Sequence, residues 1–263
     1  MDWGQIDPKG AMRQRFIDID YRTEDVREEI RRSECSWPVF ENMYDITWLY
    51  HENGLEGVVL TYPEIRSAVD NKVVSDVSLM SSYRGIKAQK QCVDLVREKA
   101  RNSRAVITVE FLKELHAMLV TKPEQIGQYR KDIPIHRTYF HEIAEPGVIE
   151  AELKEVLSFL KSKRPKDVHP IEFAASVHYR FMRCFPFSKF SGLIGRLLLN
   201  FVLMRESFIP VVFHATDRQR YYESLRGSER DFCGFLCEVM ENSLDNTIKF
   251  FQSQQQVSKL RRA

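Results

Sequence analysis

The chain has 263 residues, enough for one sizeable core, and its 43% hydrophobic and 29% charged residues are typical of a globular protein. A net charge of +2, from 39 basic and 37 acidic residues, gives no broad field to attract nucleic acid or an anionic membrane. The five cysteines include no CxxC pair, which argues against a disulfide framework. With no signal peptide visible and no apolar run of about 20 residues, we expect a cytoplasmic protein that binds neither nucleic acid nor membrane.

The N-terminal third predicts helices. Residues 10–32 are strongly charged, with apolar residues at loose helical spacing, and we assign residues 1–45 to an N-terminal helical arm. Apolar side chains within 38–51 predict a helix with one buried face. Thr108 precedes an apolar stripe over 109–119 and is typical of a helix N-cap.

Residues 128–147 have a different pattern. Apolar and polar residues alternate from Ile133, and Pro146-Gly147 ends the segment, which predicts a β-hairpin or extended flap. An exposed strand there could bind a partner segment through backbone hydrogen bonds. The candidate partner-binding residues are Ile133, Ile135, His136, Thr138 and Tyr139. The histidines of this segment lack helical spacing and further ligands, so no metal site is assigned.

The C-terminal half is again helical in pattern. Helices are predicted around 153–160 and over 170–184, with a break at Pro186. From Leu193 the sequence is apolar on most sides, which predicts a central core helix. Two further helices are expected at 217–227 and 230–252. We place the main domain at residues 46–250 and a C-terminal tail at 251–263.

Residues 178–200 read HYRFMRCFPFSKFSGLIGRLLLN. This segment resembles the signature of the Fic/Doc family, HxxFxxIHPFxDGNGRxxRLLxN. Gly127-Gln128-Tyr129-Arg130 is similar to the family's GxYR motif, and residues 53–57, within 46–60, resemble its inhibitory-helix motif. The resemblance implies an all-α, Fic-like helical bundle with one short β-hairpin flap.

Members of this family typically transfer AMP from ATP to a hydroxyl group of a target protein. The resemblance places Phe185 where the family has its histidine base and Lys189 where it has an acidic magnesium ligand. No catalytic residue and no metal ligand are therefore assigned, and no cofactor is expected beyond a weakly bound nucleotide without metal. The loop residues that could still hold phosphate are Lys189, Ser191, Gly192 and Arg196.

The resemblance also makes Glu56 the natural partner of Arg196, because the family's inhibitory glutamate pairs with this arginine. The surrounding motif differs, however, since Glu52 replaces the usual serine and Val58 the usual asparagine. Two interpretations stay open: a Glu56–Arg196 ion pair, or a helix that is retained only as structure. His178 is expected to be a core histidine that bonds across helices.

These patterns support three hypotheses. The first is a pseudoenzyme that binds or regulates a protein partner through the flap, the loop groove or a homodimer surface. The second is a divergent nucleotidyl or AMP transferase that modifies a protein hydroxyl without the usual base and metal ligand. The third is a structural or toxin–antitoxin-type interaction protein. The loss of base and metal ligand favours the first.

Overall fold

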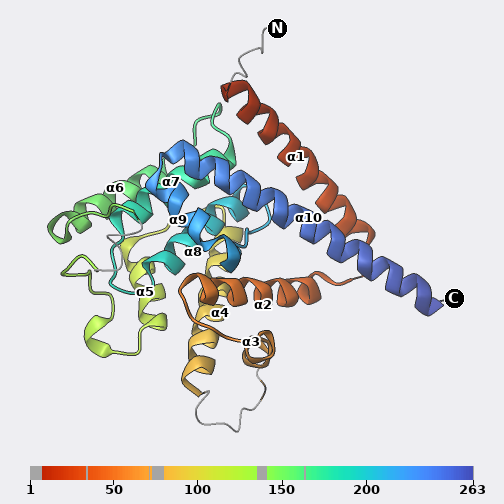
Figure 1. Ribbon diagram of the computed structural model, residues 1–263, viewed down its shortest axis with the longest axis horizontal. Helices are drawn as coiled ribbons and strands as arrows, with labels where there is room; N and C mark the ends of the chain where they lie inside the picture. The colour runs from red at the N-terminus through yellow and green to blue at the C-terminus, as the bar shows by residue number, and fades with distance from the viewer. Residues whose placement is uncertain are drawn as a thin grey trace.

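The computed structural model describes residues 8–33, 35–70, 72, 80–134, 141–162 and 164–262 (Figure 1). Within these ranges the fold is all-α, as the helical periodicity predicts. The α-helices are α1 (Pro8–Arg32), α2 (Trp37–Leu55), α3 (Tyr62–Val69), α4 (Met80–Arg101), α5 (Val109–Leu119), α6 (Ile149–Lys161), α7 (Pro170–Cys184), α8 (Ser191–Arg205), α9 (Arg218–Arg226) and α10 (Glu229–Arg262). Short 3-10 turns occupy Pro123–Gln125, Pro146–Val148 and Ala215–Asp217.

The expected β-hairpin flap is not seen in the described part of the chain, which contains no strand. Four of its candidate residues, Ile135, His136, Thr138 and Tyr139, lie outside the described residues. Ile133 is described and half-buried, in a segment without regular structure that follows Arg130.

Helix α8 forms the centre of the molecule, as its apolar composition predicts. Every residue from Ser191 to Leu203 is buried. Helices α7 and α4 pack against it, and Gly195 allows the closest approach, because a Cβ there would come within 2.9 Å of the Phe181 ring. The site residues on α7 and α8 are therefore held by a rigid core.

Helices α1 and α10 lie side by side and run in the same direction (Figure 1). Arg15 pairs with Glu241 at 2.6 Å near one end, and Gln255 donates to Glu29 at 3.1 Å near the other. Ile19 of α1 is fully buried. The N-terminal segment is thus part of the packed structure, and the tail expected from residue 251 continues α10 to Arg262.

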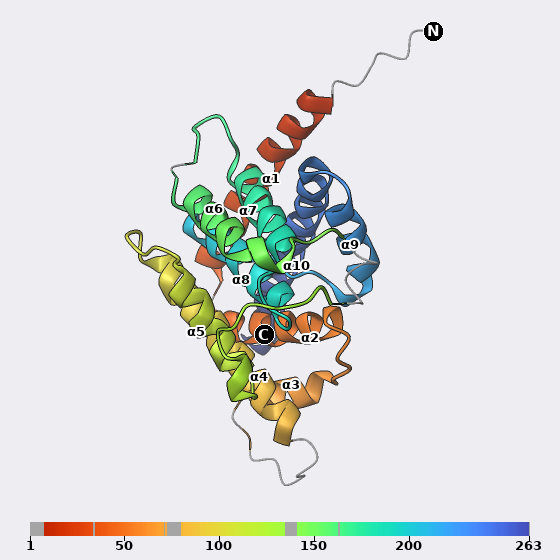
Figure 2. The same cartoon turned by 90° about the vertical axis from the view of Figure 1, so that its left-hand side faces the viewer.

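Helix α2 crosses the region in which we expected a boundary between residues 45 and 46 (Figure 2). The helix continues through this region because its apolar face is continuous, with Phe40, Ile46 and Leu49 buried. Asp45, also buried, binds Arg97 of α4, with Arg97 Nη1 3.2 Å from Asp45 Oδ2. None of the helices in the described part is long and apolar enough to cross a membrane.

Candidate functional site

The loop between α7 and α8 has two residues in left-handed backbone conformation. Phe185 has a φ of 44° and ends α7, and Phe190 has a φ of 64° and precedes α8. Residues other than glycine adopt the left-handed backbone conformation rarely and at a cost of about 1–3 kcal/mol. The Ser191 hydroxyl closes the loop, because it donates to the Phe187 carbonyl and accepts from the Phe187 amide, each at 2.8 Å. Ser191 is therefore occupied within the loop.

Phe185, at the position that the resemblance gives to a histidine base, is 1% exposed. Its ring meets the His141 ring edge-on at 6.2 Å between centroids. The guanidinium of Arg130 donates from Nε to the Phe185 carbonyl oxygen at 2.7 Å. This position thus holds a buried hydrocarbon ring, which can neither accept nor donate a proton.

Lys189, just before α8, and Gly192, in its first turn, are close in sequence but have different surroundings. Lys189 is exposed to solvent and Gly192 is buried. A Cβ on Gly192 would lie 2.6 Å from Glu56 Oε1. The absence of a side chain at Gly192 therefore gives the Glu56 carboxylate its place beside the first turn of α8, the positive end of the helix dipole.

Arg196 is the most enclosed charged residue of this region, with a side chain 1% exposed. Its Nη2 donates to Glu56 Oε1 at 2.5 Å, so the Glu56–Arg196 pair considered from the sequence is present in the structure. Its Nε also lies 2.9 and 3.0 Å from the two carboxylate oxygens of Glu52, and its Nη2 makes a further bond to Glu52 Oε1. Two carboxylates therefore surround one guanidinium. They raise the pKa of Arg196 further above its usual value, although burial alone acts in the opposite direction.

A buried chain of hydrogen bonds continues from Arg196 into the core. Arg196 Nη1 donates to the Tyr221 hydroxyl at 3.3 Å, and this hydroxyl lies 2.9 Å from His178 Nε2. His178 Nδ1 lies 2.9 Å from the Gly195 carbonyl, which can only accept, so Nδ1 carries the proton and the Tyr221 hydroxyl donates to Nε2. Burial lowers the pKa of His178 to about 3. The histidine is thus a neutral core residue that bonds across helices.

The end of α2 is fixed so that Glu52 and Glu56 face α8. Gly57, with a φ of 80°, stops the helix in the left-handed conformation that glycine favours, and the Val58 amide donates back to the Asn53 carbonyl at 2.8 Å. The Asn53 and Gln89 side-chain amides bond reciprocally at 2.9 and 3.1 Å and hold α2 against α4. The carboxylates consequently have little freedom to leave.

Arg130 anchors both ends of the segment that carries the flap candidates. Besides Phe185, it donates to the carbonyls of Asp132 and Cys184, each at 3.3 Å, and to that of Ala144. Burial lowers its pKa. Beside this anchor is a cleft of about 450 Å³ lined by Ile133, residues 141–144, Glu152 and Arg183. Among the described residues, no three His, Cys, Asp or Glu side chains are grouped to hold a metal.

Sequence reasoning missed two of these features. Glu52 was noted only as a departure from the family motif, although its spacing of four residues from Glu56 places both on one face of a helix. Arg130 was recognised only as a motif residue, and its contacts with four carbonyls could not be found from spacing. Conversely, the structure does not bring Lys189 and Arg196 to a shared surface, because the first is exposed and the second is enclosed.

Comparison with known proteins shows which family this region resembles. Residues 106–203 match the model of the Fic/DOC family, a range that includes α5 to most of α8. This segment of the chain is similar to the Fic/DOC family. Glu52, Glu56 and Tyr221, which complete the surroundings of Arg196, lie outside the matched range.

Two curated relatives of this chain are described as protein adenylyltransferase Fic. The protein from Nematostella vectensis is 29% identical over 203 residues, covering 75% of this chain and 47% of the relative. That from Aedes aegypti is 27% identical over 208 residues, covering 76% of this chain and 41% of the relative. The chain therefore spans less than half the length of these relatives.

Solved Fic structures share the fold. A Fic domain containing signaling protein from Bacteroides thetaiotaomicron superposes with a TM-score of 0.75 at 22% identity, covering 91% of this chain and 98% of the other. Fic-1 from C. elegans, residues 134–508, superposes with a TM-score of 0.77 at 21% identity, covering 93% and 74%. At these identities the likeness concerns the fold.

Proposed function

We propose that this Fic-fold protein does not transfer nucleotides and acts as a binding or regulatory module. The observation that carries the proposal is the double carboxylate on Arg196. A phosphate group would have to replace Glu52 or Glu56 at a guanidinium that is 1% exposed. Removing one partner from a buried charge pair costs about 3–5 kcal/mol, so nucleotide binding would begin with a large penalty.

The position of Phe185 supports the same proposal. A general base contributes about two to four decades of rate, and a phenyl ring cannot replace it. Phe185 is also buried beneath Arg130 and His141, so no water or hydroxyl group can take up the missing role at that point. The motif of this chain therefore lacks the proton acceptor, and the buried Phe185 ring fills its position.

The positive charge of Lys189 also supports the proposal that the protein does not transfer nucleotides. The resemblance requires a carboxylate here to hold magnesium beside the phosphates, and an ammonium group repels a divalent cation. Lys189 could attract a phosphate by itself, which is the basis of the alternative, a divergent transferase. The enclosure of Arg196 counts against this alternative, because the two cations would have to act together on one ligand.

The partner we propose is a protein segment bound at the cleft beside Arg130. Glu142 and Glu152 line this cleft, and Arg183 pairs with Glu142 at 3.2 Å. Of the flap candidates, Ile133 lines the same cleft. A segment that enters there would meet polar backbone and carboxylate groups, and a homodimer would be one way to supply it.

Incubation of the purified chain with α-³²P-labelled ATP and magnesium, alone and with a cell extract, tests the proposal. We expect no labelled product, while a Fic adenylyltransferase assayed in parallel labels its target. The matched variant Glu52→Ala/Glu56→Ala exposes Arg196 to ligand and should also remain inactive, because Phe185 and Lys189 are unchanged. Labelling that requires this chain and is lost on Arg196→Ala would refute the proposal.

The alternative has its own test in thermal unfolding with ATP, CTP, GTP and UTP. A divergent transferase predicts a rise in melting temperature that Lys189→Ala abolishes. A pseudoenzyme of the proposed kind predicts no rise with any of the four nucleotides. Arg66→Ala, which removes an exposed cation on α3, provides the control for non-specific charge effects.

A further inference from the structure

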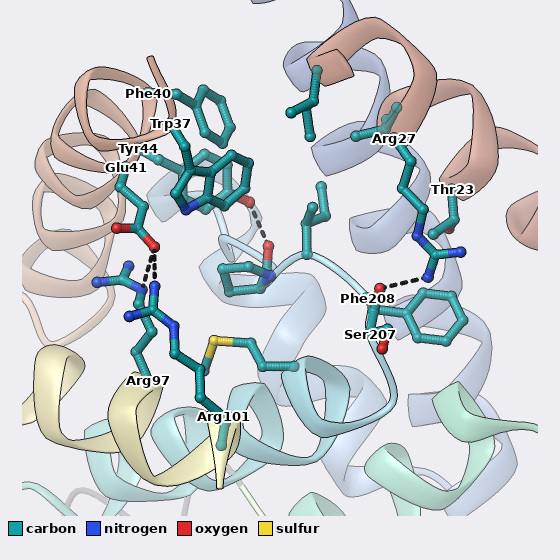
Figure 3. Close-up of a pocket in the computed structure, with 16 residues that line it drawn as sticks. Thr23, Arg27, Trp37, Phe40, Glu41, Tyr44, Arg97, Arg101, Ser207 and Phe208 are labelled. Carbon is teal, nitrogen blue, oxygen red and sulfur yellow. Dashed lines mark hydrogen bonds and ion pairs between the residues drawn. The ribbon is translucent and has the colours of Figure 1, made fainter.

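A second cavity lies at the other end of α2, away from Glu52 and Glu56 (Figure 3). It measures about 290 Å³ and is bounded by α1, the first turns of α2, the last turns of α4, Met204 of α8 and residues 207–210. None of its lining residues belongs to the loop between α7 and α8. It is therefore separate from the Arg196 site and does not depend on the function proposed above.

The wall of this cavity is largely apolar and aromatic. Trp37, Phe40 and Tyr44 extend into it from one face of α2 (Figure 3). Ile30 and Ile209 also line it. Helical spacing of three and four residues brings the three aromatic side chains together. Trp37 is 37% exposed at the rim, so part of its indole ring is available to a ligand.

The polar groups in the wall are already used within the protein. The Tyr44 hydroxyl donates to the Pro210 carbonyl, and the Thr23 hydroxyl donates to the Ile19 carbonyl at 2.8 Å. A ligand inside the cavity therefore gains mainly from burial of apolar surface, worth about 25 cal/mol per Å². This favours a ligand with an apolar body.

The mouth, in contrast, is charged and mainly basic. Arg27, Arg97 and Arg101 line the cavity together with a single acidic residue, Glu41. With their ion-pair partners behind the wall included, the cations are Arg27, Arg31, Lys90, Arg97 and Arg101 and the carboxylates are Glu24, Glu41, Asp45 and Asp94, which leaves one positive charge in excess. An anionic group on the ligand would balance this excess.

Arg101 is the cation best placed to receive that group. Its side chain is 65% exposed, and its ion pair with Glu41, at 3.0 Å, is made through Nη2, so that among the described contacts Nε and Nη1 have no protein partner. Arg27 is more engaged, because it donates to the Ser207 carbonyl at 2.9 Å and to Glu24 at 2.9 Å. Glu24 is shared with Arg31, so it does not remove the excess charge.

We propose that this cavity binds a small carboxylic acid whose body is an aromatic bicycle or a chain of about ten carbons, with its carboxylate at Arg101. An apolar cavity of about 150 Å³ holds benzene, so 290 Å³ accommodates a body of about twice that size. The occupant is a small molecule because four helices, α1, α2, α4 and α8, and residues 207–210 bound the cavity.

Isothermal titration calorimetry of the full chain with 2-naphthoate and with its uncharged amide tests this proposal. We expect saturable binding of the acid, at least tenfold tighter than that of the amide. Arg101→Gln should weaken binding of the acid five- to tenfold and leave the amide unchanged. Arg66→Gln is the matched control, because its side chain is 62% exposed on α3, and it should leave both affinities unchanged.

Two further variants locate the ligand. Trp37→Ala removes an aromatic wall at the exposed rim and should weaken the acid and the amide alike. Ala100→Phe fills the cavity and should abolish binding of both. The proposal is overturned if the acid does not bind, if acid and amide bind equally, or if Trp37→Ala leaves both affinities unchanged. The Trp37 variant keeps the test decisive if Ala100→Phe does not fold.

Discussion

Both carboxylate oxygens of Glu52 accept from Arg196 Nε, at 2.9 and 3.0 Å. Glu56 accepts one hydrogen bond, from Arg196 Nη2 at 2.5 Å. The Glu52 side chain is 5% exposed and that of Glu56 is 21% exposed. Glu52 is thus the principal counter-ion, and Glu56 the more accessible one.

This difference predicts unequal effects on stability. Glu52→Ala should lower the free energy of unfolding by about 3–5 kcal/mol, because it leaves a buried cation with one weakly placed partner. Glu56→Ala should cost only about 1–2 kcal/mol, because Glu52 remains and repulsion between the carboxylates is relieved. Urea unfolding measures both, with the exposed Glu150→Ala as a control that should cost less than about 1 kcal/mol, since it removes only a surface pair with Lys154. A larger loss for Glu56→Ala would contradict the assignment.

The buried His178 predicts a dependence of stability on pH. Its pKa is lowered to about 3 in the folded chain, against about 6.5 when unfolded, so the unfolded chain binds the extra proton between these values. Stability is therefore complete above pH 6.5 and falls as the pH decreases towards 3. This histidine should cost about 2 kcal/mol between pH 7 and 5. His178→Asn should show a loss smaller by that amount, and an unchanged slope would exclude the neutral histidine.

Arg130 predicts a coupling between the flap segment and the end of α7. Arg130→Lys should lower the free energy of unfolding by about 2–4 kcal/mol, because an ammonium group cannot reach all of the carbonyls that the guanidinium spans. Hydrogen exchange should accelerate at the Ala144 amide, which donates to the Arg183 carbonyl at 2.7 Å. Arg220→Lys, on the surface of α9, is the control. Unchanged exchange at Ala144 would show that Arg130 does not anchor the segment.

The double variant Phe185→His/Lys189→Asp restores two groups that the family resemblance requires. We expect it to remain inactive with labelled ATP, because the new imidazole would occupy a site that is 1% exposed and Arg196 would still be held by two carboxylates. Circular dichroism would verify that the variant is folded. Robust nucleotidyl transfer by this variant would show that the carboxylates do not block the site.

The cysteines should differ in reactivity towards iodoacetamide. Burial raises the pKa of Cys92 and of Cys184 to about 12, so their thiolates are scarce at pH 8. Cys35 is partly exposed and should be alkylated first. Mass spectrometry of peptides after timed labelling measures the order, and early labelling of Cys184 would contradict its enclosure.

Local patterns in the sequence were sufficient for most of the helical architecture. The apolar stripe after Thr108 corresponds to α5, and the uniformly apolar stretch from Leu193 corresponds to the central α8. Both could be predicted because the signal lies in consecutive residues. The boundary expected between residues 45 and 46 falls within α2, so the division into an arm and a main domain stays a prediction.

The candidate site was less predictable because its decisive contacts are between distant elements. The sequence indicated that Phe185 and Lys189 replace chemical groups, since a motif fixes their positions. It could not show that Glu52 makes more hydrogen bonds to Arg196 than Glu56 does. This difference depends on the orientation of α2, which the Asn53–Gln89 contact and Gly57 fix.

The contact between Glu52 and Arg196 joins residues that are 144 positions apart. At about 5–20 residues per second, a ribosome would add Arg196 to the chain about 7–30 seconds after Glu52. During this interval Glu52 and Glu56 lack the counter-charge that Arg196 supplies, and the central helix has not been made. Closure of the core is thus a late step of biosynthesis, and a chain interrupted before α8 would expose the apolar face of α2 to chaperones and proteases.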